Sequence, residues 1–164
     1  MATLLRKLID ETRSRAPNRP ALIGVSGAQG SGKSYRCKQF AAAHPSVAYF
    51  SLDDVYYTRA ERESHARSFV HAYLQDPPQR FHDLDPLTFP KFTPSEREVV
   101  KEKLHPLLTT RGPPGTHDLG LAQGLIARLR TRAATPLPRF DKARDERAPE
   151  ETWPLFVGPA EAIL

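Results

Sequence analysis

The alternation of apolar and polar positions predicts a helix and then two strands at the start of the chain. Four apolar residues recur at helical spacing with charges between them: Leu4, Leu5, Leu8 and Ile9. This spacing predicts a short amphipathic helix packed on the domain. The apolar runs ALIGVS (21–26) and SVAYFSL (46–52) predict buried strands. Residues 32–43 are expected to form a helix between them, so the order predicts an α/β unit with a parallel sheet.

Two capping boxes predict where the next helices begin. Each has a threonine that can cap the helix and a glutamate three residues later, in TRAE (58–61) and TPSE (93–96). The second box has proline at the first helical position, which favours a helix from there to about Leu104. Residues 76–93, between the two helices, are expected to be a loop.

The last part of the chain alternates loops with one helix and one strand. Residues 109–118 read as a loop, and Asp118 can cap a following helix. That helix has one apolar face, formed by Leu119, Ala122, Leu125, Ile126 and Leu129. A loop rich in proline and charge is expected over 135–159. The final AEAIL is expected to begin a further strand.

Composition and charge narrow the class of protein. The chain has 164 residues, which fits one domain, and its net charge of +5 favours an anionic partner such as nucleotide phosphates, a carboxylate metabolite or nucleic acid. Its one cysteine, Cys37, excludes an internal disulfide. No apolar run approaches the roughly 20 residues of a membrane span, and the start lacks a secretory signal. A cytoplasmic protein without a membrane partner is therefore expected.

The stretch GAQGSGKS matches the Walker A pattern and lies between a predicted strand and a predicted helix. Its glycines let successive N–H groups converge on phosphate oxygens, and the helix points its positive end at the same anion. Lys33 can reach the β- and γ-phosphates, and the Ser34 hydroxyl can ligate Mg²⁺. The glycine spacing does not fit a dinucleotide-binding loop. The expected contacts of ATP or GTP are Gly27, Ala28, Gln29, Gly30, Ser31, Gly32, Lys33, Ser34 and Tyr35.

Two aspartates, Asp53 and Asp54, end the second predicted strand. The carboxyl ends of strands in an open α/β sheet face the ligand crevice. A carboxylate there can accept the proton of an attacking hydroxyl or hold Mg²⁺. The alternative interpretation is a solvated acid in a turn that caps the next segment.

These motifs together resemble the P-loop kinases of small metabolites, and more narrowly the D-glycerate 3-kinase family. The stretches that carry the resemblance, besides the glycine loop, are SLDDVYYTRAER, RGPPGTHDL, PRFDKARDERAP and TWPLFVGPAEAIL. They run from about Leu22 to Leu164. The resemblance implies a three-layer α/β P-loop kinase fold with a parallel sheet, spanning residues 1–164 as a single domain.

The resemblance also implies roles for individual residues. Lys33 and Asp53 would be catalytic, with Mg²⁺ held by Ser34 and Asp53. The residues expected to contact a small hydroxy acid, D-glycerate, are Asp54, Arg111, His117, Asp118, Asp141, Lys142 and Arg147. For two of them a structural role is the alternative, because Asp118 can be a helix cap and His117 a structural loop histidine.

The sequence departs from the family at its end. Family members continue past the last strand into an acidic segment, a lid and further helices, so the fold is expected to be incomplete at the C-terminus. The main hypothesis is an ATP-dependent hydroxy-acid kinase. The alternatives are a truncated, catalytically impaired ATP-binding protein, a related nucleoside or metabolite kinase, and a P-loop protein acting on nucleic acid. The last is disfavoured because the basic residues are dispersed and no aromatic–basic platform is present.

Overall fold

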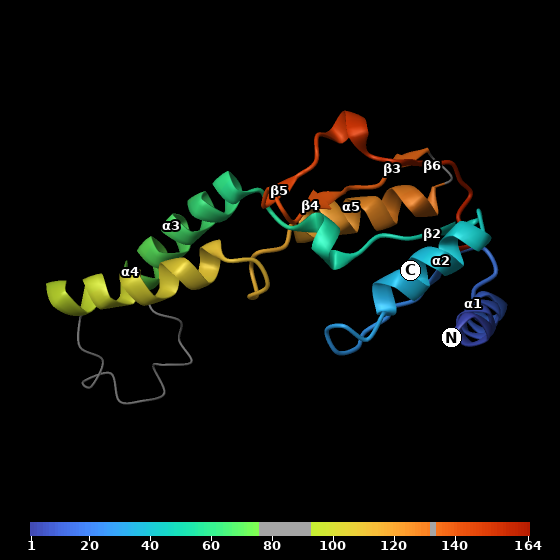
Figure 1. The fold of residues 1–164 in the computed structure, drawn as a ribbon, viewed down its shortest axis with the longest axis horizontal. Helices are drawn as coiled ribbons and strands as arrows, with labels where there is room; N and C mark the ends of the chain where they lie inside the picture. The colour runs from blue at the N-terminus through green and yellow to red at the C-terminus, as the bar shows by residue number, and fades with distance from the viewer. Residues whose placement is uncertain (76–92, 132–133) are drawn as a thin grey trace. The chain divides into compact units, whose positions relative to one another are not determined.

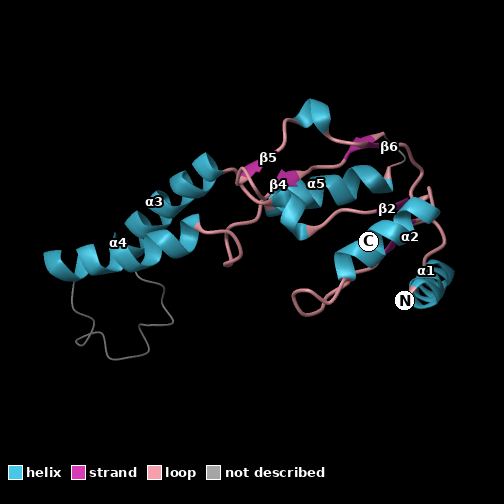
Figure 2. Cartoon of the chain, in the orientation of Figure 1, coloured by secondary structure: helices cyan, strands magenta, loops and turns pink. Residues whose placement is uncertain are grey.

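The computed structural model of the chain describes residues 1–75, 93–131 and 134–164 (Figure 1). Helices make up most of the regular structure, and the strands are short (Figure 2). The chain forms two compact units. Unit 1 comprises Met1–Val55, Asp118–Asp141 and Arg147–Leu164. Unit 2 comprises Tyr56–His117 and Lys142–Glu146. The expectation of a single domain stays a prediction.

Unit 1 is built on a three-stranded parallel sheet, as the sequence predicts. Its strands are β1 (Ala21–Leu22), β2 (Val47–Ala48) and β7 (Ala162–Ile163), in the order β1-β7-β2. The strand expected in AEAIL is thus the central one. The first two strands are shorter than predicted, although single hydrogen bonds extend the pairing, such as Ile23 N–H to the Ile163 carbonyl at 2.9 Å. Pairing on β1 ends there because the chain then enters the glycine-rich loop.

Two helices cover one face of this sheet. They are α1 (Ala2–Arg15) and α2 (Lys33–Ala43), which match the predicted helices closely. The cluster that they form with the strands contains Leu5, Ile9, Ala21, Phe40, Val47 and Ala162. In α1 only Leu5 and Ile9 of the predicted apolar set are buried, whereas Leu4 is 58% exposed. The amphipathic helix is confirmed, with a narrower apolar face than its sequence suggests.

The opposite face of the sheet packs against α5 (Leu119–Arg130). Ala48 and Ile163 lie in one cluster with Leu129 and Leu137. Their neighbours along the strands lie in the other cluster, because successive strand residues point to opposite faces. The sheet of unit 1 therefore has helices on both faces, which gives three layers.

The chain that follows α5 contains short elements where the sequence suggests only a loop. β3 (Thr135–Pro136) pairs antiparallel with β6 (Leu155–Phe156), and the 3₁₀ turn η3 (Glu150–Thr152) lies between them in sequence. Two more short strands are β4 (Phe140–Asp141) and β5 (Glu146–Arg147). The expectation of an irregular segment was wrong here. Alternation over two residues is too brief a signal to recognise in a sequence.

Unit 2 is mainly a pair of helices packed along each other, α3 (Arg59–Gln75) and α4 (Pro94–Thr109). Both predicted capping boxes are present: Glu61 accepts from Thr58 N–H at 2.7 Å, and Glu96 accepts from Thr93 N–H at 2.8 Å. Helix α4 runs five residues past the predicted end. The loop expected over 76–93 lies outside the described residues except for its last member.

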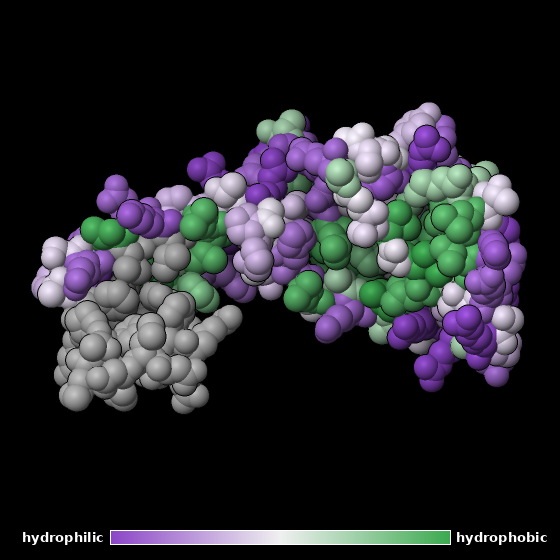
Figure 3. All heavy atoms as spheres, turned by 90° about the horizontal axis from the view of Figure 1, so that it is seen from below, coloured by the Kyte–Doolittle hydropathy of each residue, from purple (hydrophilic) through white to green (hydrophobic). Residues whose placement is uncertain are grey.

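Some apolar side chains of each unit reach the surface (Figure 3). Leu22 and Leu52 of unit 1 are 46% and 60% exposed, and Phe69 and Leu107 of unit 2 are 50% and 57% exposed. Within the described ranges, no helix combines the length and apolar character needed to cross a bilayer.

Candidate functional site

The parallel sheet of unit 1 brings the two predicted motifs to one edge. Strands β1 and β2 both run parallel to β7, so their carboxyl ends lie on the same side. The glycine-rich loop follows β1, and the 3₁₀ turn η1 (Leu52–Val55), which contains both aspartates, follows β2. The carboxyl edge of such a sheet is where α/β proteins bind ligands.

The loop over residues 27–32 is an exposed turn that depends on glycine. Gly30 and Gly32 both have φ of +76°, a left-handed conformation that strains other residues. A Cβ on Gly27 would lie 3.2 Å from the Ser31 hydroxyl oxygen, so that position is also tight. Gly32 is the N-cap of α2, and among the described residues no side chain caps that helix end. Its first N–H groups are therefore available to an anion.

Lys33, Ser34 and Tyr35 form the first turn of α2 directly after this loop. Lys33 is half-buried, whereas Ser34 and Tyr35 are exposed. Tyr49, next to β2, lies beside the Ser34 side chain. Burial raises the pKa of the Tyr49 phenol, while side-chain hydrogen bonds with Ser34 and Ser51 lower it. The hydroxyl expected to ligate Mg²⁺ thus has a tyrosine neighbour that the sequence did not single out.

The two aspartates of η1 have different surroundings. Asp54 is buried at 9% exposure and accepts from the N–H groups of Ser51 at 3.1 Å and Phe140 at 3.4 Å. Its carboxylate also pairs with Arg139 at 3.4 Å. Asp53 is half-buried, and its N–H donates to the Ser51 hydroxyl at 3.2 Å. Asp54 therefore anchors the strand end through these contacts, and the catalytic role of Asp53 stays a prediction.

A second ion pair lies at the start of α5, against the end of η1. Asp118 N–H donates to the Val55 carbonyl at 2.7 Å, and the Asp118 carboxylate accepts from Leu121 N–H at 2.8 Å. The alternative role of Asp118 as a helix cap is thus present. The same carboxylate pairs with Arg147 at 3.4 Å. Around η1 the structure gathers two aspartates and two arginines in ion pairs.

Of these residues, Arg139 was missed by the sequence reasoning. It belongs to the stretch PRFDKARDERAP, which carries part of the family resemblance. Its partner Asp54 lies 85 positions away, so only the folded chain reveals the pair. Asp141 lies in β4 and is half-buried.

Three of the predicted substrate contacts lie in unit 2: Arg111, His117 and Lys142. Arg111 pairs with Asp145 at 2.8 Å and donates to the Lys142 carbonyl at 3.4 Å. Asp145 also pairs with Arg62 at 2.5 Å, and the Arg62 side chain is fully buried. His117 stacks on Tyr56 with ring centroids 4.2 Å apart. These contacts fix Arg111 and His117 within their own unit.

The donors at the carboxyl edge suit Mg²⁺ bound together with phosphates. The Ser34 hydroxyl and the Asp53 carboxylate are both oxygen donors, the type that Mg²⁺ takes. In the described parts of the chain, no group of three or more His, Cys, Asp or Glu side chains could hold a metal ion. One or two protein ligands with substrate phosphates are the usual arrangement for Mg²⁺, so these residues fit it.

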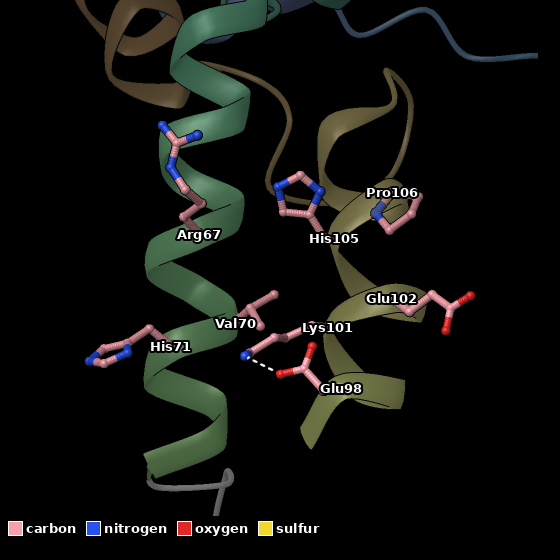
Figure 4. A pocket seen from close by; sticks show the side chains of 8 residues that line it. All are labelled: Arg67, Val70, His71, Glu98, Lys101, Glu102, His105 and Pro106. Atoms are coloured by element: carbon pink, nitrogen blue, oxygen red, sulfur yellow. Dashed lines mark hydrogen bonds and ion pairs between the residues drawn. The ribbon is translucent and has the colours of Figure 1, made fainter. Parts of the chain in front are cut away.

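Unit 2 also has a groove of about 670 Å³ between α3 and α4 (Figure 4). It is lined by charges of both signs, among them Lys101, which donates to Glu98 at 2.6 Å. His105, another lining residue, pairs with Glu63, which does not line the groove, at 3.2 Å. The groove carries neither the glycine loop nor the aspartates of η1, so it is not the candidate site.

Comparisons with known proteins agree with the resemblance at the level of fold. Two solved structures share the fold of the chain: the YGR205w protein, 24% identical with a TM-score of 0.60, and D-glycerate 3-kinase from Cryptococcus neoformans var. grubii serotype A, 21% identical with a TM-score of 0.61. They cover 98% and 99% of this chain. The chain spans about half the length of each, 49% and 50%. No family model and no curated protein matches it.

Proposed function

We propose that the chain binds Mg–ATP on residues 27–35 and belongs to a kinase that phosphorylates the hydroxyl of a small hydroxy acid, D-glycerate. One observation carries the proposal: a glycine loop with two left-handed glycines precedes an uncapped helix at the carboxyl edge of a parallel sheet. The shared fold with a D-glycerate 3-kinase supports the choice of acceptor.

In this proposal, positive charge and backbone N–H groups hold the triphosphate. Backbone N–H groups of the loop and the first turn of α2 would hold the triphosphate, and Lys33 would neutralise its β- and γ-oxygens. Ser34 and Asp53 would hold Mg²⁺, which neutralises charge on the transferring phosphoryl group when it is bound.

The transfer step would use Asp53 as the proton acceptor. The acceptor hydroxyl attacks the γ-phosphorus, its O–P bond forms, and the bond from the γ-phosphorus to the β–γ bridging oxygen breaks to release ADP. The hydroxyl proton passes to the Asp53 carboxylate. The carboxylate of the acceptor needs a cation. The arginine among the predicted substrate contacts of unit 1 is Arg147, whose guanidinium pairs with Asp118 at 3.4 Å.

Calorimetric titration with ATP in excess Mg²⁺ tests nucleotide binding. We expect wild type to bind and Lys33→Ala to bind at least about tenfold more weakly, because a charge-assisted contact is lost. Lys38→Ala is the matched control, because it removes a lysine from the same helix, α2, outside the predicted nucleotide contacts. The Lys38 ammonium lies 6.0 Å from the centre of the Tyr49 ring. The absence of detectable Mg–ATP binding to the wild-type chain would refute the proposal.

Mass spectrometry of a reaction with ATP and D-glycerate tests transfer. Phosphoglycerate formed by wild type and lost in Asp53→Asn supports the kinase. Binding of Mg–ATP without transfer to any tested hydroxy acid or nucleoside would instead support the second candidate, an ATP-binding protein without catalysis.

A further inference from the structure

A polar cavity lies at the amino edge of the sheet of unit 1, opposite the edge that carries the glycine loop. Pro20, Ser46 and Glu161 directly precede β1, β2 and β7, and all three line the cavity. Its volume of about 530 Å³ is within the range of small-molecule sites. The cavity is therefore separated from the candidate nucleotide site by the length of the strands.

Among the described residues that line this cavity, the carboxylate is that of Glu161, and it is already neutralised. Glu161 accepts from Arg6, from Arg13 at 3.0 Å and from the Ser46 hydroxyl at 2.8 Å. Arg6 also pairs with Asp10. The charges of Arg6, Arg13, Asp10 and Glu161 sum to zero, so this cluster neither repels nor attracts an anion strongly.

Two further arginines line the cavity outside that balanced cluster. They are Arg19, in the segment before β1, and Arg130, at the end of α5. In the described part of the chain, neither side chain has a hydrogen-bond or ion-pair partner. The cavity thus carries two uncompensated positive charges, with the Asn18 side chain also in its lining.

Helix ends explain these arginines only in part. Basic residues stabilise the C-terminal turns of helices, and both α1 and α5 end near the cavity. However, the Arg128 carbonyl already accepts from the N–H and the hydroxyl of Thr131, the latter at 2.8 Å. Arg19 belongs to neither helix. A helix-dipole role therefore leaves Arg19 unexplained.

We propose that this cavity binds a small phosphate-bearing anion, held by Arg19 and Arg130 with help from the Asn18 amide. Guanidinium groups match phosphate oxygens with paired hydrogen bonds, and two unpaired arginines match the charge of a phosphate monoester near pH 7. The site is distinct from the glycine loop and does not depend on the proposed function.

Amide NMR on the full chain, titrated with inorganic phosphate at constant ionic strength, tests the proposal. We expect saturable shifts of the Asn18, Arg19 and Glu161 amides in the wild type. The Arg19→Gln/Arg130→Gln variant should weaken them at least about tenfold, because two charge-assisted contacts are lost. Arg128→Gln is the matched control, since Arg128 lies on α5 but does not line the cavity.

The alternative phosphate site on the glycine loop is separated by the same spectra. Shifts confined to the amides of residues 27–34, or no saturable shifts at all, would overturn the proposal. Equal affinity in the wild type and in the double glutamine variant would overturn it as well. Both replaced side chains are exposed, so the spectrum of the variant should keep the dispersion of a folded chain.

Discussion

Replacing Glu161 by glutamine removes the charge that ties α1 to the central strand. The Glu161 carboxylate accepts a hydrogen bond from Arg6 on α1, and Glu161 directly precedes β7 in the chain. Its pKa is lowered to about 2 from an ordinary 4.5, chiefly by the hydrogen bond from Arg6. A drop of this size corresponds to at most about 3 kcal/mol of unfolding free energy. Because Arg6 and Arg13 are 36% and 43% exposed, solvent screens the cluster and we expect about 1–2 kcal/mol for Glu161→Gln near pH 7.

The stabilisation by Glu161 should decrease as the pH is lowered. A carboxyl group with a lowered pKa in the folded state stabilises above its unfolded pKa, near 4.5, and that stabilisation is lost as pH falls through the folded value near 2. The difference between wild type and Glu161→Gln should therefore be full at pH 7 and shrink to about half near pH 3.5. Urea unfolding followed by circular dichroism, repeated across this range, measures it.

The control is Glu11→Gln, which removes an exposed carboxylate from α1, the helix that carries Arg6. Glu11 pairs with Lys7 at 3.8 Å, and both side chains are at least half exposed. We expect a change below about 0.5 kcal/mol for it. A difference for Glu161→Gln that is equally small at pH 7, or that does not change with pH, would refute the ion-pair reasoning.

Two further changes test the packing of unit 1 and the capping of unit 2. Ile163→Ala, in the fully buried central strand, should destabilise by about 2–5 kcal/mol because it leaves a cavity between the sheet and α5, and chemical unfolding would measure the loss. A loss below about 1 kcal/mol would contradict the packing against α5. Thr93→Ala should lower helical content or stability by about 1 kcal/mol because Thr93 caps α4. Lys103→Ala, at an exposed position later in the same helix, is its control, and equal effects of the two changes would argue against the cap.

The longer helices and the glycine loop of this protein follow from its sequence. Capping boxes at Thr58 and Thr93 mark two helix starts because the side chain and the backbone that bond each other are three residues apart. Glycines at positions 30 and 32 mark the loop because their conformation is closed to other residues. The parallel sheet follows from the order of strand, loop, helix and strand.

Contacts between distant segments came only from the tertiary structure. Asp54 lies 85 positions from Arg139, and Glu161 lies 155 positions from Arg6, so no local pattern pairs them. The anchoring of Asp54 also depends on the fold, and so does the cavity at the amino edge of the sheet that Arg13, Arg19 and Arg130 line. The sequence alone determined where the longer helices and the glycine turn form, because backbone geometry and capping act over a few residues. The short elements between α5 and β7 appeared only in the folded chain. Only folding decided which charges meet, because ion pairs form wherever the packed core brings distant side chains together.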